Sequence, residues 1–303
     1  MSLDAEAIDR QAYGKWQDIY NTLGIPVGDG SHKGCPLCGD GNNAHRFRMD
    51  GATSNGKWIC TQCGAGTGLS MVQKYFNIAF PEALEKVNEI VGDCEVRKPE
   101  PKPDPSIALN KVWKASVPLV GSDPVSKYLR NRGLLFHPDA LRYCAECWNS
   151  DTKQNMPAMI AMLANHKGAP VTIHRTYLTM DGEKADVPKP KKLMPGKEHL
   201  AGCAIRLFPP VNGWIGVAEG IETAISCHQM FDAPCWAVTG TSLMESFSPP
   251  DGVKKISIYA DKDANFSGEK AAYTLAKRLY LDDYIVEVVV PDEIGDFNDI
   301  LAK

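Results

Sequence analysis

The sequence lacks several features that would define its class at once. No apolar run approaches the roughly 20 residues that a membrane-spanning helix needs, and the first residues hold no apolar core of a secretion signal. No G-x-x-x-x-G-K-[ST] motif occurs, which excludes a P-loop motor within the chain. Hydrophobic residues make up 44% and charged residues 23% of the 303 positions, as in an ordinary globular protein. We therefore expect a cytoplasmic protein of two or three domains that does not associate with a membrane.

Cysteine is plentiful and is arranged for metal binding. Four of the ten cysteines form two C-x-x-C pairs, Cys35 with Cys38 and Cys60 with Cys63, separated by 21 residues. This spacing is typical of a zinc ribbon, in which four thiolates converge on one ion. Because so small a module buries little apolar surface, zinc would supply much of its folding energy.

Composition divides the chain into four segments. An amphipathic pattern over residues 4–23 predicts one helix before the ribbon. Four prolines lie among charged residues between positions 97 and 105, which predicts an extended linker. The expected organisation is a zinc-binding domain at 1–93, a Pro-rich linker at 94–106, a basic subdomain at 107–212 and a C-terminal subdomain at 213–303.

The C-terminal segment alternates strands with helices. Short apolar runs at 214–218, 255–260 and 285–290 flank helical patterns at 221–231 and 267–281. This order predicts βαβ units and a parallel sheet. The runs show little alternation, so each strand is expected to be buried on both faces.

Acidic residues follow each of the three predicted strands. Glu219 comes after the first, Asp261 and Asp263 after the second, and Asp296 after the third. One such residue is more often a turn former or a helix cap. Three strand ends of this kind would meet at one edge of a parallel sheet, where ligands bind. Carboxylate oxygens are the ligands that Mg²⁺ prefers, so a magnesium site is the favoured interpretation.

Charge is distributed unevenly although the net charge is only −4. Residues 107–212 carry 15 basic and 8 acidic side chains, and residues 213–303 carry 7 and 15. A basic region beside an acidic metal site suits an enzyme that processes a polyanion. The alternative is chance segregation of solvated surface charge.

These motifs resemble those of one protein family. The Glu-Gly at 219–220, the Asp-x-Asp at 261–263 and the Gly-Glu-Lys-Ala-Ala helix from residue 268 resemble a Toprim domain, although the turn after Asp263 is about two residues longer than usual. C-P-L-C, H-R-F-R and W-I-C-T-Q-C-G resemble the zinc ribbon of primases. Y-L-x-x-R-G-L, H-R-T-Y-L and G-x-A-I-R-L resemble the first half of a plasmid-type primase core. Together they indicate a bacterial-type (DnaG-like) DNA primase of the phage or plasmid kind.

The resemblance implies a fold and a reaction. It implies an α+β zinc ribbon followed by a polymerase core, which consists of a mixed α/β subdomain and a Toprim α/β subdomain with a parallel sheet. Glu219, Asp261 and Asp263 would be catalytic, and with Asp296 they would hold Mg²⁺ or Mn²⁺ for two-metal transfer of nucleotides from NTPs onto primers on single-stranded DNA. A separately encoded replicative helicase would be a partner, because the chain has no motor and ends soon after Asp299.

Basic residues are candidates for contact with the template or the nucleotide, although any one of them is more often a surface residue or an ion-pair partner. The candidates are Arg46, Arg48, Arg130, Arg132, Arg175, Lys184, Lys191, Lys192 and Arg206. Two other functions stay open. One is a Toprim-type Mg²⁺-dependent nuclease, and the other is a catalytically silent factor that binds single-stranded DNA or loads a helicase.

Overall fold

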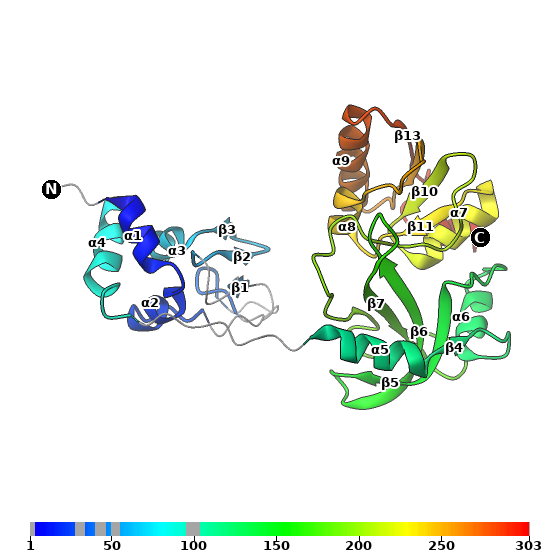
Figure 1. Ribbon diagram of the computed structural model, residues 1–303, viewed down its shortest axis with the longest axis horizontal. Coiled ribbons are helices and arrows are strands. Elements are labelled where there is room, and N and C mark those ends of the chain that lie inside the picture. Colours follow the sequence, from blue (N-terminus) through cyan, green and yellow to red (C-terminus); the bar gives the residue numbers. More distant parts are fainter. Residues whose placement is uncertain (1–3, 28–33, 40–46, 50–54, 95–103, 303) are drawn as a thin grey trace. The chain divides into compact units, whose positions relative to one another are not determined.

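The computed structural model describes residues 4–27, 34–39, 47–49, 55–94 and 104–302 (Figure 1). The chain divides into two compact units, residues 1–103 and residues 104–303. In the part of the chain that the structure describes, no helix has both the length and the apolar character to cross a membrane.

The described residues of the first unit form four helices and a three-stranded antiparallel sheet of order β1-β2-β3. Residues 4–23 do not form the single helix that was predicted, because Gly14 adopts a positive φ of 78° and breaks the chain direction. The elements are α1 (Ala5–Ala12), α2 (Trp16–Thr22), β1 (Phe47–Met49), β2 (Trp58–Cys60), β3 (Gly64–Gly66), α3 (Gly68–Phe76) and α4 (Phe80–Ile90).

Aromatic side chains join the helices of the first unit to its sheet. Trp16 is fully buried, and a Cβ added at Gly56 or Gly68 would lie 2.6 or 2.3 Å from its ring. These two glycines therefore allow the backbone to approach the indole. Phe47 and Trp58 stack at 6.4 Å between ring centroids, across the first two strands. The unit thus has an apolar core of its own beside the cysteine cluster.

The predicted linker is shorter than expected at its C-terminal end. Pro105 is the first residue of α5 (Pro105–Ala115), and Asp104 caps this helix by accepting a hydrogen bond of 2.9 Å from the Ser106 amide. Proline suits the first helical position because its missing N–H would have no partner there. Residues 95–103 of the predicted linker lie outside the described residues.

The second unit is organised around one mixed sheet. Its strands run in the order β13-β12-β10-β11-β9-β6-β5-β4, and β7 and β8 continue from β6. The first half supplies α5, β4 (Val117–Pro118), α6 (Pro124–Asn131), β5 (Leu141–Asn149), β6 (Gln154–Ala164), β7 (Pro170–Tyr177), β8 (Lys191–Leu193) and β9 (Ala204–Ile205). The second half supplies β10 (Trp214–Ala218), α7 (Ile221–Phe231), β11 (Cys235–Ala237), α8 (Thr241–Ser246), β12 (Lys255–Tyr259), α9 (Ser267–Leu281), β13 (Ile285–Val289) and α10 (Phe297–Leu301).

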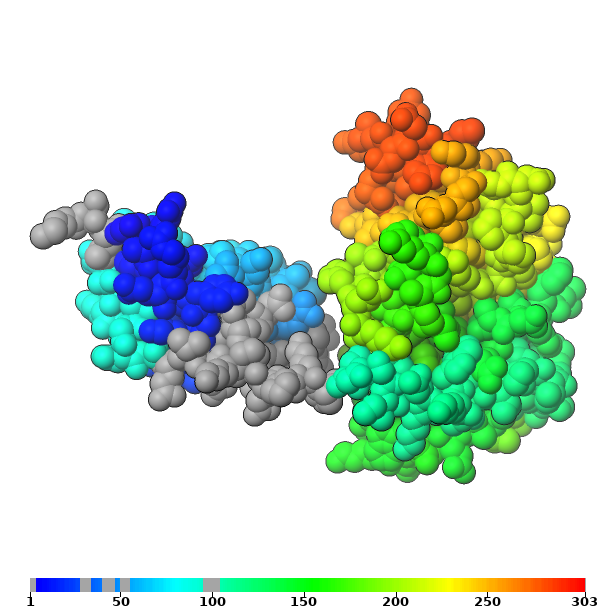
Figure 2. Space-filling view, in the orientation of Figure 1, coloured from blue at the N-terminus to red at the C-terminus, as the bar shows by residue number. Residues whose placement is uncertain are grey.

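The four strands β13, β12, β10 and β11 are parallel, which confirms the predicted parallel sheet. Helices α7 and α10 pack on one face of these strands and α8 and α9 on the other, giving three layers (Figure 1). Strand β9 pairs antiparallel with both β11 and β6, so the sheet is continuous between the two halves of the unit. Both halves also meet in the space-filling view (Figure 2).

One prediction about burial is wrong. Strand β13 is at the edge of the sheet rather than inside it, and Ile285 is 66% exposed. Its apolar run therefore does not have the double burial that the sequence pattern indicates. The central strands β10 and β12 do have it, since four of the five residues in each are buried.

Candidate metal and nucleotide site

The four predicted zinc ligands lie together in the first unit. The ligand atoms of Cys35, Cys38, Cys60 and Cys63 are all within 4.8 Å of one another. The Sγ atoms of Cys35 and Cys63 are 3.9 Å apart, as are those of Cys38 and Cys60. With Zn–S bonds of about 2.3 Å, a tetrahedral site has sulfur–sulfur edges of about 3.8 Å. The residues present therefore fit a structural zinc ion.

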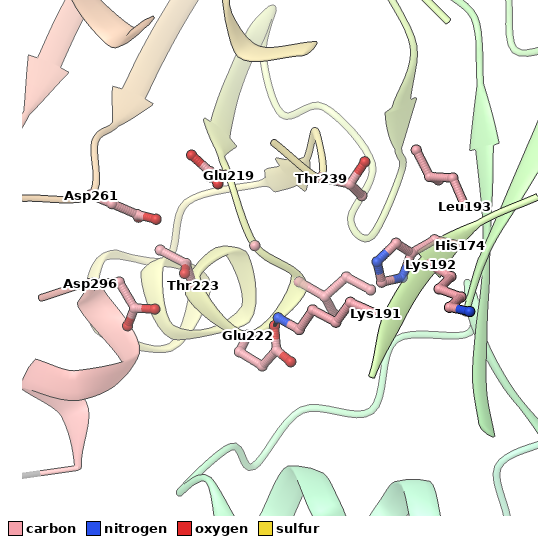
Figure 3. A pocket seen from close by; sticks show the side chains of 12 residues that line it. His174, Lys191, Lys192, Leu193, Glu219, Glu222, Thr223, Thr239, Asp261 and Asp296 are labelled. Carbon is pink, nitrogen blue, oxygen red and sulfur yellow. Dashed lines mark hydrogen bonds and ion pairs between the residues drawn. The ribbon is translucent and has the colours of Figure 1, made fainter. Parts of the chain in front are cut away.

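Three of the predicted acidic residues line one cavity in the second unit. Glu219 follows β10, Asp261 follows β12, and Asp296 precedes α10, so the sheet brings together residues that are 77 positions apart in sequence (Figure 3). The cavity has a volume of about 340 Å³. It lies at the carboxyl ends of the parallel strands, where the open edge of such a sheet binds ligands.

The electrostatics of this cavity favour a cation. Burial and the negative charges of Glu219 and Asp296 raise the pKa of Asp261 from 3.8 to about 7. Burial and the charge of Asp263 also raise the pKa of Glu219. In addition, the Oδ1 atom of Asp261 is buried and has no hydrogen-bond partner. An oxygen-rich site of repelling carboxylates with an unpaired oxygen fits a hard divalent cation such as Mg²⁺.

Asp263 and Asp296 make local hydrogen bonds at the starts of helices. Asp263 does not line the cavity, because its Oδ2 accepts hydrogen bonds from Ser267 Oγ at 2.7 Å and from the Gly268 amide at 3.0 Å, at the start of α9. Asp296 caps α10 by accepting from the amides of Asn298 and Asp299. The Asp263 carboxylate thus bridges the longer turn that follows it, from Asp263 to Gly268. Whether Asp263 holds a metal stays a prediction.

Two lysines and a histidine line the opposite wall of the cavity. Lys191 and Lys192 come from β8 and His174 from the paired strand β7 (Figure 3). Lys192 Nζ is 2.6 Å from Asp151 Oδ1, whereas Lys191 Nζ donates to Glu222 Oε2 at 2.9 Å. Burial and the positive charge of Lys191 lower the pKa of His174 to about 4, so its imidazole is neutral near pH 7.

None of the remaining candidate basic residues that the structure describes in the second unit lines this cavity, although the charges of Lys191, Glu222 and Asp296 act on Lys184. Arg206 Nη2 donates to the carbonyls of Asn165 and His166, and its guanidinium stacks 4.6 Å from the Trp236 ring centre. Other predicted side chains also have partners within the fold or lie exposed, and their role in binding stays a prediction. Arg130 donates to the Gly121 carbonyl, Arg132 to Asn298 Oδ1 and Arg175 to the Trp148 carbonyl, Lys184 is exposed, Arg48 is exposed on β1, and Arg46 lies outside the described residues.

Arg206→Ala is expected to destabilise the second unit. The change removes two hydrogen bonds to carbonyls and a cation–π contact, which together contribute about 2 to 3 kcal/mol. Chemical denaturation monitored by circular dichroism measures the effect. Lys167→Ala, an exposed change in the same loop region, is the control and should leave the midpoint nearly unchanged. Equal midpoints for both variants would contradict an internal role for Arg206.

Sequence reasoning missed one residue that lines the cavity, Glu222, and its hydrogen-bond partner Tyr128. Glu222 is 3% exposed, and its Oε1 accepts a hydrogen bond of 2.5 Å from Tyr128 Oη. Burial would raise the pKa of Glu222, but the charge of Lys191 and the hydrogen bonds from Tyr128 and Lys191 lower it to about 2. The only signal in the sequence was the position of Glu222 three residues after Glu219. Its partners are 94 and 31 residues away, which no local pattern reveals.

Family models match three parts of the chain. Residues 30–69 match the zinc-binding domain of primase-helicase, residues 104–207 a domain of unknown function, and residues 214–303 the Toprim domain. The predicted zinc ribbon and Toprim domain are therefore confirmed. This pairing of domains agrees with the resemblance to bacterial-type primases.

Solved primase structures are similar to the chain at low identity. The Aquifex aeolicus primase with its zinc-binding and RNA polymerase domains is 16% identical, with a TM-score of 0.46 over 100% of this chain and 82% of that one. A DNA primase domain from Pseudomonas aeruginosa is 16% identical, with a TM-score of 0.43 over 66% and 74%. The primase fragment of the bacteriophage T7 primase-helicase protein is 15% identical, with a TM-score of 0.39 over 88% and 92%.

Proposed function

We propose that the chain is a DNA primase, which makes short RNA primers from NTPs on a single-stranded DNA template. The observation that carries this proposal is the cavity where Glu219, Asp261 and Asp296 face Lys191 (Figure 3). Carboxylates on one wall and an ammonium group on the other suit a triphosphate with its metal ions. The match to a primase-type zinc-binding domain in the same chain supports a template-dependent reaction.

Each group has a defined part in the proposed reaction. Glu219, Asp261 and Asp296 would hold Mg²⁺ or Mn²⁺, with Asp263 nearby at the start of α9. When bound, the cations lower the pKa of the attacking hydroxyl and neutralise charge on the phosphates. Lys191 would donate a hydrogen bond to a phosphate oxygen from the other wall. No side chain needs to form a covalent intermediate, so positioning and electrostatic stabilisation would supply the rate.

The proposed partners follow from the same assignment. The substrates would be NTPs and single-stranded DNA, and the basic residues of 107–212 would meet the template backbone. A separately encoded replicative helicase is the proposed partner that would open the duplex. The four-cysteine ribbon with the exposed Arg48 would contact the template at a second place.

A priming assay tests the proposal. Single-stranded DNA, labelled NTPs and Mg²⁺ are incubated with the wild-type chain and with the Asp261→Ala/Asp263→Ala variant. Short labelled oligomers from the wild type alone would support primase activity. Asp251→Asn changes an exposed acidic residue outside the cavity and is the matched control, which should prime as the wild type does.

Other outcomes distinguish the competing functions. Metal-dependent loss of the template without synthesis would identify a nuclease. If neither reaction occurs but single-stranded DNA is bound, a replicative helicase is added to the assay. Continued absence of synthesis would then identify a silent binding or loading factor.

A further inference from the structure

A buried carboxylate outside the acidic cluster holds the lysine of the cavity. The Glu222 side chain is 4% exposed, while the side chain of Lys191 is 39% exposed. Both oxygens of Glu222 have a partner, since Oε1 accepts from Tyr128 at 2.5 Å and Oε2 from Lys191 at 2.9 Å. The three groups come from α6, β8 and α7, so the contact joins both halves of the second unit.

The lysine has other carboxylates within its electrostatic reach. Lys191 lines the same cavity as Glu219, Asp261 and Asp296. A lysine side chain has a flexible four-carbon stem and a compact charge, so a free amine would move to the most negative group nearby. In this cavity that group is the set of Glu219, Asp261 and Asp296, which the amine would neutralise in place of a metal ion.

Stability alone does not explain such an arrangement. Desolvating a buried ion pair costs about as much as the pair returns, and apolar side chains of the same volume serve a core as well. Glu222 is buried and Lys191 faces the cavity, so a function in the cavity explains this pair better than stability does. The geometry supplies one, because Glu222 fixes the amine on the wall away from the acidic cluster (Figure 3).

We infer that Glu222 is a positioning residue, which together with Tyr128 keeps the Lys191 amine off the carboxylates of the cavity and leaves them free for divalent cations. This inference rests on the proposed function. An ammonium group has three donors, and Glu222 accepts from one of them. The amine can therefore donate to a phosphate oxygen while it stays paired with Glu222.

The test measures metal affinity without nucleotide or DNA. Mn²⁺ is titrated into the full-length chain and the free ion is followed by electron paramagnetic resonance at fixed ionic strength. Glu222→Gln should weaken Mn²⁺ binding by about tenfold, because the released amine competes with the ion for the carboxylates. Lys191→Met should not weaken it. The Glu222→Gln/Lys191→Met double variant should recover the wild-type affinity while it remains poor in primer synthesis.

The same titration shows when the inference is wrong. Wild-type Mn²⁺ affinity in a folded Glu222→Gln variant would overturn it, as would equal losses in the single and double variants, because Lys191 would then play no part. Should Glu222→Gln fail to fold, Tyr128→Phe removes only the 2.5 Å hydrogen bond and should weaken Mn²⁺ binding in the same direction. A wild-type chain that binds no Mn²⁺ and makes no primers would instead overturn the proposed function, and the inference with it.

Discussion

Replacing Asp261 by asparagine is expected to lower primer synthesis by at least about a thousandfold. The variant keeps the size of the side chain but removes one negative charge from the carboxylates that would hold the catalytic cations. Metal ions contribute several kcal/mol to the stabilisation of charge in such reactions, and each 1.4 kcal/mol or so changes a rate tenfold. The measurement is the initial rate of primer formation at saturating NTP and Mg²⁺.

The same substitution is expected to stabilise the metal-free chain. The folded state raises the pKa of Asp261 from 3.8 to about 7, so it binds a proton more tightly than the unfolded state does. The sign follows from linkage: this carboxyl group favours folding below about pH 4, and its contribution is lost as the pH rises towards 7. At pH 8 the wild type therefore carries a penalty of about 2 to 4 kcal/mol that Asp261→Asn lacks.

Denaturation in the presence of a chelator measures this effect. Between about pH 4 and pH 7 the wild-type free energy of unfolding should fall relative to that of Asp261→Asn, and addition of Mg²⁺ should reverse the order of the two. Asp251→Asn should follow the wild type at every pH. Parallel curves for wild type and Asp261→Asn would show that the acidic cluster exerts no repulsion, and would remove the electrostatic reason for a cation site.

Replacing Cys60 by serine is expected to remove zinc and unfold the ribbon of the first unit. Cys60 is 1% exposed, and its Sγ is 3.9 Å from that of Cys38 within the four-cysteine cluster. Structural zinc contributes on the order of 10 kcal/mol or more to the folding of small zinc domains. Metal analysis should change from one zinc per chain to none, and the amides of β1 and β2 should lose protection from hydrogen exchange.

Cys94→Ser is the matched control for this variant. Cys94 is also a buried thiol of the first unit, at 7% exposed, but it does not belong to the cluster. The Cys94→Ser variant should retain one zinc per chain, and the amides of β1 and β2 should stay protected from hydrogen exchange. Retention of zinc by the Cys60→Ser variant would contradict the assignment of this residue as a ligand. Protected strands without zinc would instead show that the core around Trp16 and Trp58 folds without metal.

The elements that the sequence predicts well are those with short-range signals. Central strands β10 and β12 match their apolar runs, and α9 begins and ends where its pattern does, at residues 267 and 281. The short strand β11 escaped prediction, because it has only three residues and no periodicity to detect, and no local pattern indicates that it pairs with β9. These two strands nevertheless join the halves of the second unit, so the continuity of its sheet was not predictable.

Arginines illustrate a second limit. Arg206 and Arg132 lie in the basic segment and were predicted to bind phosphate. In the fold, however, Arg206 donates to two loop carbonyls and Arg132 donates to Asn298. A sequence shows that a guanidinium is present and does not show which acceptors surround it. The distinction depends on packing between segments that are 40 and 166 residues apart.

By itself, the sequence determined the zinc ligands and the acidic residues at the strand ends. The turn within a C-x-x-C pair brings its two thiols close together, and the end of a parallel strand places the next residue at the edge of the sheet. Both positions therefore follow from local spacing. Three outcomes came from the tertiary structure alone: Asp263 accepts hydrogen bonds from Ser267 and Gly268 at the start of α9, β13 is an edge strand, and Glu222 binds both Lys191 and Tyr128. Those outcomes depend on which distant segments pack together, and burial then selects the partners that each charged group must have.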